Sequence, residues 1–152
     1  MLGQSALPAN TELDLDTPDE LAIRSLILGI VHRTIGDYVT ARLLFNDALK
    51  HGANVEISTW VSAFAYFELA VLEMKEGERK AAEREAKSED AGREEEKGMT
   101  EWGHTFKVAR EMLAQATGMC TREMDLSSRL DSRIVMLREE IKKKKDMVGY
   151  EE

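Results

Sequence analysis

The residues best suited to catalysis or metal binding are three histidines and one cysteine. His32, His51 and His104 are widely spaced, and none stands in the cysteine or carboxylate arrangement typical of zinc. Cys120 has no adjacent base to generate a thiolate, so we interpret it as a small helix residue. Phosphate-binding loops, nucleophile elbows and zinc-protease motifs are absent from the sequence. We therefore expect a protein without catalysis, cofactor or metal.

Composition favours a single soluble all-α domain. The 152 residues include 43% hydrophobic and 33% charged residues and only 2 prolines. A net charge of −8 argues against a nucleic acid partner, because a phosphate-binding surface needs excess cations. One cysteine cannot form an internal disulfide, which is typical of a cytoplasmic or nuclear protein. The longest apolar stretch, residues 60–74, contains Glu68 and is too short to span a bilayer.

Helix signals place the first two helices. Thr17 can cap a helix that begins at Pro18, and Glu20 has the spacing of a capping box. Gly36 interrupts the apolar pattern of this helix, and Asp37 can cap the next one, which Gly52 would end. So short a turn predicts an antiparallel pair.

This pair has the spacing of a tetratricopeptide repeat (TPR), whose period is about 34 residues. Small and large residues alternate where its two helices approach each other. The matching positions are Leu28, Gly29, Gly36, Tyr38, Ala41, Phe45 and Ala48, whereas Ser25, His32 and Ala53 replace the tryptophan, tyrosine and proline of the consensus.

A second copy of this unit is interrupted. Residues 69–70 precede Gly77 by the same interval that separates residues 28–29 from Gly36. The partner helix comes much later, because residues 106–117 repeat the pattern of the second helix. Phe106 corresponds to Tyr38, Ala109 to Ala41, Leu113 to Phe45 and Ala116 to Ala48. The second pair therefore consists of residues 58–76 and 106–117, separated by a highly charged insertion.

The remaining segments complete the predicted domain organisation. We expect residues 1–16 to be an acidic disordered segment, 17–145 a TPR-like domain of about five helices, 78–103 a solvated insertion and 146–152 a disordered tail. The last helix carries one apolar stripe that would cap the repeats: Leu130, Ile134, Leu137 and Ile141. Lysines 142–145 suit the end of this helix, with a nuclear-import or anionic-membrane patch as the alternatives.

Two segments resemble the C-terminal part of the fungal inclusion-body-clearance proteins, relatives of the tetratricopeptide repeat protein 39 group. The matching residues are Phe64, Ala65, Glu68, Leu69 and Ala70, then Ser128, Arg129, Leu130, Arg133 and Ile134. The resemblance covers roughly residues 19–140 without the insertion, and family members are much longer. It implies a non-enzymatic cytoplasmic or nuclear protein linked to inclusion-body clearance and lipid droplets. Some members are labelled mitochondrial outer-membrane proteins.

A binding role needs an accessible face, and the first helix of each pair is expected to line it. The candidate interaction face is apolar: Ile23, Leu26, Ile30, Phe64, Phe67 and Val71. Leu26 and Ile30 replace the lysine and asparagine that hold a chaperone tail, so that ligand is excluded. The face is either covered by further helices or binds an amphipathic helix of another protein, including a lipid-droplet protein. Sterol or lipid binding, peripheral membrane contact and self-association are the alternatives.

Overall fold

The computed structural model describes residues 17–87, 91–120 and 126–152, and within these ranges it contains helices and turns without a strand. The helices are α2 (Pro18–Thr34), α3 (Tyr38–Gly52), α4 (Trp60–Lys87), α5 (Ala91–Met119) and α6 (Ser127–Val148). The all-α prediction is confirmed. The predicted disorder of residues 1–16 concerns a segment outside the described residues.

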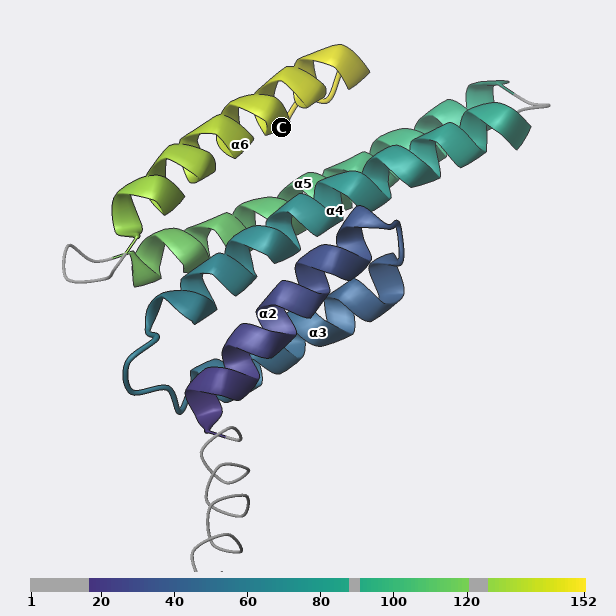
Figure 1. The fold of residues 1–152 in the computed structure, drawn as a ribbon. Helices are drawn as coiled ribbons and strands as arrows, with labels where there is room; N and C mark the ends of the chain where they lie inside the picture. Colours follow the sequence, from purple (N-terminus) through teal and green to yellow (C-terminus); the bar gives the residue numbers. More distant parts are fainter. Residues whose placement is uncertain (1–16, 88–90, 121–125) are drawn as a thin grey trace, which may run out of the picture.

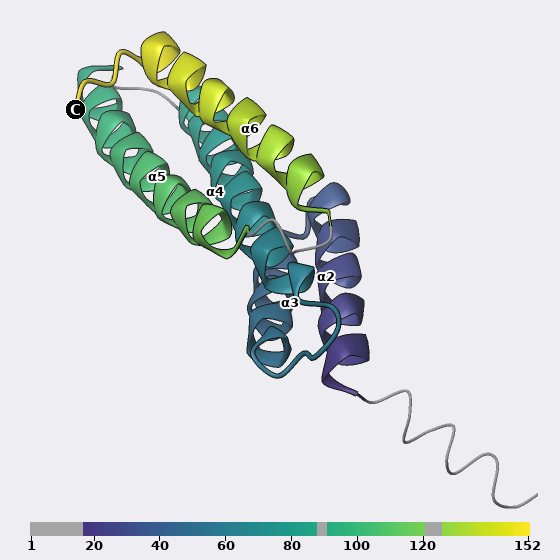
Figure 2. The same ribbon diagram turned by 90° about the vertical axis from the view of Figure 1, so that its left-hand side faces the viewer.

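The helices pack as two antiparallel pairs and a covering helix (Figure 1). α2 pairs with α3 and α4 pairs with α5, and α4 contacts both helices of the first pair. α6 lies along the second pair and contacts both of its helices, as the turned view in Figure 2 also shows. The paired arrangement predicted from the repeat pattern is therefore present.

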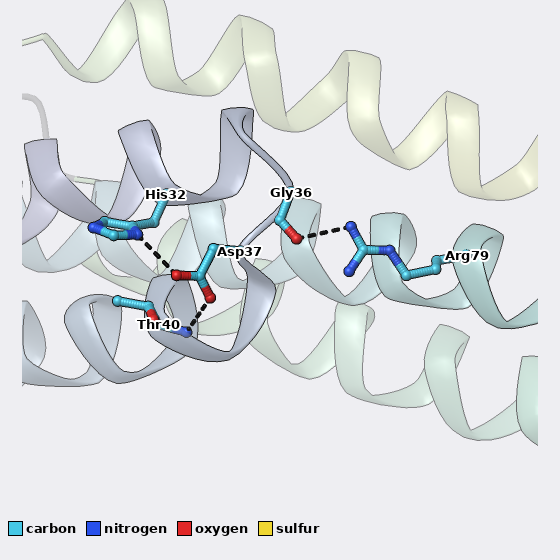
Figure 3. A network of polar contacts seen from close by, with 5 residues as sticks. All are labelled: His32, Gly36, Asp37, Thr40 and Arg79. Atoms are coloured by element: carbon cyan, nitrogen blue, oxygen red, sulfur yellow. Dashed lines mark hydrogen bonds and ion pairs between the residues drawn. The ribbon is translucent and has the colours of Figure 1, made fainter.

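Cap chemistry defines the first pair as the sequence predicts. Thr17 Oγ1 accepts a hydrogen bond from the amide of Glu20 at 3.3 Å. Asp37 accepts one from the amide of Thr40 at 3.1 Å, and the second oxygen of Asp37 lies 3.1 Å from His32 Nδ1 (Figure 3). These contacts lower the pKa of Asp37, with Thr40 as the main cause. The carboxylate is thus held ionised at the start of α3.

The turn between α2 and α3 is also tied to the second pair. Gly36 adopts a φ of 85°, a left-handed conformation that glycine tolerates best. Arg79 of α4 donates a hydrogen bond to the carbonyl of Gly36 at 2.8 Å (Figure 3), and its guanidinium lies 3.7 Å from the ring centroid of Tyr38. One arginine therefore fixes the position of α4 against this turn.

Two apolar clusters form the core, and α4 contributes to both. The first cluster joins the α2–α3 pair to one side of α4: Ala22, Leu26, Ala41, Phe45, Ala48, Val61, Ala65, Leu69 and Leu72. The second joins the other side of α4 to α5 and α6, and includes Ala63, Phe67, Ala70, Phe106, Ala109, Leu113 and Ala116. The stripe of α6 predicted from the sequence, residues 130, 134, 137 and 141, is buried in this second cluster.

The segment predicted to be a solvated insertion differs from that expectation. α4 continues to Lys87 and α5 begins at Ala91, so the segment extends both helices as a helical hairpin. Trp102 is only 5% exposed and stacks on Phe106 with ring centroids 5.3 Å apart. Solvation of the whole range is therefore wrong, because Trp102 packs over Gly77 at the base of the hairpin. The exposed positions among the described residues of this segment are 78–80, 82, 83, 85–87, 95–97 and 100.

The C-terminal boundary also differs from the prediction. α6 continues to Val148, and Gly149 ends it with a φ of 71°. Tyr150 then packs on Phe106 with ring centroids 5.3 Å apart. The tail expected to be disordered therefore folds back onto α5, because an aromatic and an acidic side chain both find partners there.

Close approach of α2 and α3 depends on a glycine. A Cβ atom on Gly29 would lie 2.5 Å from the ring of Phe45. In the second pair, Ala70 and Leu113 occupy the corresponding positions in the other cluster. A larger residue on one helix is thus matched by a smaller one on its partner.

We predict that Gly29→Ala destabilises the protein by about 1–3 kcal/mol, because the added methyl group overpacks this contact. Phe45→Leu should relieve the clash. The double variant should therefore lose less unfolding free energy than the sum of the losses in the two single variants. Urea unfolding of the four proteins measures this coupling. Gly118→Ala is the control, since no atom lies within 4 Å of its added Cβ, and it should not destabilise. Additive effects would contradict the proposed contact.

We predict that the base and the tip of the hairpin respond differently to truncation. Trp102→Ala should cost about 3–5 kcal/mol, because it removes a buried aromatic ring. Glu85→Ala, at an exposed position of the same hairpin, should change stability by less than about 0.5 kcal/mol. Thermal unfolding followed by circular dichroism distinguishes the two. Equal effects would show that the segment does not pack as described.

Candidate functional site

The structure separates the six residues of the candidate face into two groups. Leu26 and Phe67 are each only 3% exposed and lie in the first and second core clusters, respectively. The guanidinium of Arg133 lies over the ring of Phe67, 4.5 Å from its centroid. These two side chains are inaccessible to a partner, because they are buried in the core clusters. The remaining four, Ile23, Ile30, Phe64 and Val71, are half-buried beside the clusters.

Beside these residues lies a buried carboxylate, Glu68, which is 1% exposed. Arg33 of α2 lies 3.0 Å from one oxygen of Glu68, and Arg133 of α6 lies 3.4 Å from the other. The Arg33 contact is an ion pair without hydrogen-bond alignment, whereas Arg133 donates a hydrogen bond. Two helices that are distant in sequence, α2 and α6, therefore each bring an arginine to one acidic side chain of α4.

A different apolar surface is open to solvent on the far side of α2. We call it the outer face of α2. It consists of four large aliphatic side chains with their exposed fractions: Ile27 55%, Leu28 42%, Val31 49% and Ile35 70%. Positions 27, 31 and 35 are four residues apart, so they lie along one side of the helix. Helix α2 is thus apolar on two opposite sides, one of which has no covering helix among the described residues.

The internal repeat indicates what this outer face corresponds to. Gly36 corresponds to Gly77, so each residue of α2 corresponds to the residue 41 positions later in α4. By this register Leu28 and Val31 correspond to Leu69 and Leu72, and Ile27 and Ile35 to Glu68 and Glu76.

Those four residues of α4 contact the preceding helix pair. Leu69 and Leu72 are buried in the first cluster, Glu68 pairs with Arg33, and Glu76 lies 3.0 Å from Arg42 of α3. The outer face of α2 is therefore the repeat equivalent of the face by which α4 packs on α2–α3.

Sequence reasoning missed the outer face because α2 has aliphatic residues in nearly every direction. Its interior and exterior stripes both have helical spacing, so periodicity alone could not assign them. The register between the pairs provides the missing signal. Residues equivalent to Ala63, Phe67 and Ala70 face the pair's own second helix, and those equivalent to Leu69 and Leu72 face a neighbouring pair.

A polar contact joins the start of α2 to the loop before α4. Asp19 accepts hydrogen bonds from the successive amides of Glu56, Ile57 and Ser58 at 3.0, 3.1 and 2.7 Å. These amide donors, that of Ser58 first, lower the pKa of Asp19. The carboxylate therefore has a positioning role in the loop.

The histidines and the cysteine have ordinary structural surroundings. His32 bonds Asp37, and His51 lies 3.5 Å from Asp47 one turn earlier in α3. Burial raises the pKa of the Cys120 thiol, and the charge of Asp131 raises it further, so the thiolate is disfavoured. Among the described residues, no three histidine, cysteine, aspartate or glutamate side chains converge as a metal site would require. No helix in these ranges is long and apolar enough to cross a membrane.

Two grooves flank α6. One, of about 340 Å³, lies between α5 and α6, and the other, of about 310 Å³, between α4 and α6. Val71 of the predicted face lines the second groove together with Met74, Leu137 and Met147. Neither groove is lined by Phe67 of the predicted face.

Comparisons with protein-family models, with curated proteins and with solved structures find no match to this chain. The resemblance to inclusion-body-clearance proteins stays a prediction.

We predict that the charges around Glu68 are interdependent. Arg33→Met should destabilise the protein by about 3 kcal/mol, because it leaves a buried carboxylate with only the more exposed Arg133. Adding Glu68→Leu should recover most of that loss, since no uncompensated carboxylate then remains. Urea unfolding of the single and double variants measures the recovery. A double variant less stable than Arg33→Met alone would contradict this account.

Proposed function

We propose that the protein is a non-catalytic interaction scaffold of the TPR type that binds a helical segment of another protein on the outer face of α2. The observation that carries this proposal is the repeat equivalence of an exposed face and a packed one. On α4 this face is covered by a helix pair, and on α2 four aliphatic side chains in the same positions are 42–70% exposed.

The energetics of these side chains support a binding role. Fully burying an aliphatic side chain contributes about 1.5–3 kcal/mol. Because the four are roughly half-exposed, covering them would contribute on the order of 1 kcal/mol each. A contiguous apolar stripe of this kind on a charged protein is typical of an interaction surface.

The chemistry of the partner follows from two substitutions between the repeats. Glu68 and Glu76 of α4 pair with arginines of the preceding helices, whereas α2 has Ile27 and Ile35 at these positions. A partner that presented arginines here would leave their charges unpaired on binding. We therefore expect a partner helix, or helix pair, that presents apolar residues.

The cellular setting is proposed on the resemblance alone. It would be the clearance of protein inclusion bodies and contact with lipid-droplet proteins, in the cytoplasm or nucleus. Sterol or lipid binding at the predicted face is less well supported, since Phe67 is buried beneath Arg133. Self-association through the outer face is a separate alternative that the following experiment distinguishes.

The test places the photo-crosslinking residue p-benzoylphenylalanine at Val31, or at the exposed Lys50 of α3 as a matched control, in cells that produce the protein. We expect discrete protein adducts at position 31 and their absence at position 50. Ile27→Glu combined with Ile35→Glu should remove the adducts at position 31, because burying two unpaired carboxylates against an apolar partner costs free energy. Circular dichroism should show an unchanged melting temperature, since both positions are exposed.

Three outcomes would contradict the proposal. Adducts that are equal at positions 31 and 50, or insensitive to the two glutamates, would show that the face is not a specific site. A crosslinked homodimer as the sole product would assign the face to self-association.

A further inference from the structure

A groove between α5 and α6 has cations on its rim and an apolar floor. Leu113 and Ile141 form the floor, and the rim carries Arg110, Arg138, Lys142 and Lys145. Its volume is about 340 Å³, which is in the range of ligand sites. Four cations and no acid line this groove, although the whole protein has a net charge of −8. We call it the cationic groove.

The chain places its own acidic segment, residues 150–152, at one end of this groove. Gly149 turns the backbone back after α6, and the amide of Tyr150 bonds the carbonyl of Lys145 at 3.0 Å. The Tyr150 ring then packs on Phe106 and lies against Gly103.

The carboxylate of Glu152 completes this contact. It accepts a hydrogen bond from Lys145 Nζ at 2.8 Å and lies 2.5 Å from the guanidinium of Arg110. The bond from Lys145 and the charge of Arg110 lower the pKa of Glu152, so this carboxylate is ionised at neutral pH. The groove thus already accepts one carboxylate.

The remainder of the groove is open. Arg138 donates a hydrogen bond to Thr117 Oγ1 at 3.0 Å, and neither Arg138 nor Lys142 has a carboxylate partner among the described residues. Lys142 is exposed, and the floor residues Leu113 and Ile141 are 1% and 3% exposed. A ligand that fits this arrangement carries an apolar group with one carboxylate on each side of it.

We propose that the cationic groove binds an acidic peptide segment of a partner protein, with an apolar residue between two carboxylates, and that residues 150–152 compete with it as a tethered occupant. The first carboxylate of the peptide replaces Glu152 on Arg110 and Lys145. Its apolar side chain lies in the groove above the buried Leu113 and Ile141, and its second carboxylate reaches Arg138 and Lys142. This site is separate from the outer face of α2.

The hold of the internal segment on the groove is weak enough to be displaced. The Glu152 side chain is 53% exposed and that of Arg110 52%, and exposed ion pairs contribute little net stability. Because the segment is tethered, it nevertheless competes with the peptide. The apparent affinity of the peptide is the intrinsic affinity multiplied by the fraction of molecules in which Glu152 has left the groove.

The experiment uses the full chain and a fluorescein-labelled peptide of sequence Gly-Tyr-Glu-Glu-Leu-Leu-Asp, with anisotropy as the readout. We expect saturable binding, about two- to fivefold tighter for Glu152→Gln, because that change removes the exposed ion pairs of the internal competitor. Arg138→Gln combined with Lys142→Gln should weaken binding about tenfold or more. Lys107→Gln, at an exposed position of α5 outside the groove, should not change it.

Each alternative result overturns the proposal. Absence of peptide binding to both the unmodified chain and Glu152→Gln would exclude the site. Equal affinities of these two proteins would exclude the competition, and an unaffected Arg138/Lys142 double variant would exclude the groove. Binding of oleate without binding of the peptide would assign the groove to a fatty acid instead. Ile27→Glu should leave peptide affinity unchanged, so this test is independent of the outer face.

Discussion

The packing of the two helix pairs and the covering helix α6 depends on the charge of Glu68. A carboxylate that is 1% exposed requires compensation, and it receives it from Arg33 in the preceding pair and Arg133 in the covering helix. Desolvating such a group costs free energy that its ion pairs only partly offset. The main effect of Glu68 is therefore to fix the position of α4 along α2 and α6. If α4 moved by one residue, Glu68 would leave both arginines and Leu69 would face a charge. The position of α4 is therefore fixed more sharply than apolar packing alone would require.

Apolar packing supplies the stability that this charged contact does not. Gly29 lies against the ring of Phe45 in the first pair, and the equivalent residues of the second pair, Ala70 and Leu113, are both buried in the second cluster. Because interiors are close-packed, a change in one partner is felt by the other. The two pairs can therefore have the same spacing of packed positions although different residues occupy those positions.

The parts of the fold that follow from local chemistry were predictable from the sequence. Thr17 and Asp37 bond the amides that their cap positions predict, and the match of residues 106–117 to the second helix identified the buried side of α5. The length of α4 and α5 was not predictable in this way. Alanine, glutamate, lysine and arginine favour helix formation, and pairing two such helices through Gly77 and Trp102 gives them a packed base. Low apolar content alone suggested a solvated arm.

The candidate site was harder to predict, because burial depends on which neighbour each side of a helix meets. Leu26 and Phe67 have the spacing of an exposed stripe, yet both are buried in the core clusters, and Arg133 of α6 lies over the ring of Phe67. For α6 the stripe of residues 130, 134, 137 and 141 was predicted correctly, since most of its other positions are charged or polar, with Val135 and Met136 as exposed exceptions. Sequence periodicity therefore identifies the face of a helix with one neighbour, but not that of α2, which is apolar on two sides.

The two ends of the described helical stack differ in chemistry as a result. At one end α6 covers the second pair with an apolar stripe, and its exposed positions are mostly charged, with Val135 and Met136 among them. At the other end α2 presents Ile27 and Ile35, where α4 has the acids that recognise Arg33 and Arg42. The equivalent acceptor surface of a second copy is already covered by its own α4. Head-to-tail stacking of identical chains is thus opposed by both coverage and charge, which favours a different partner for the outer face.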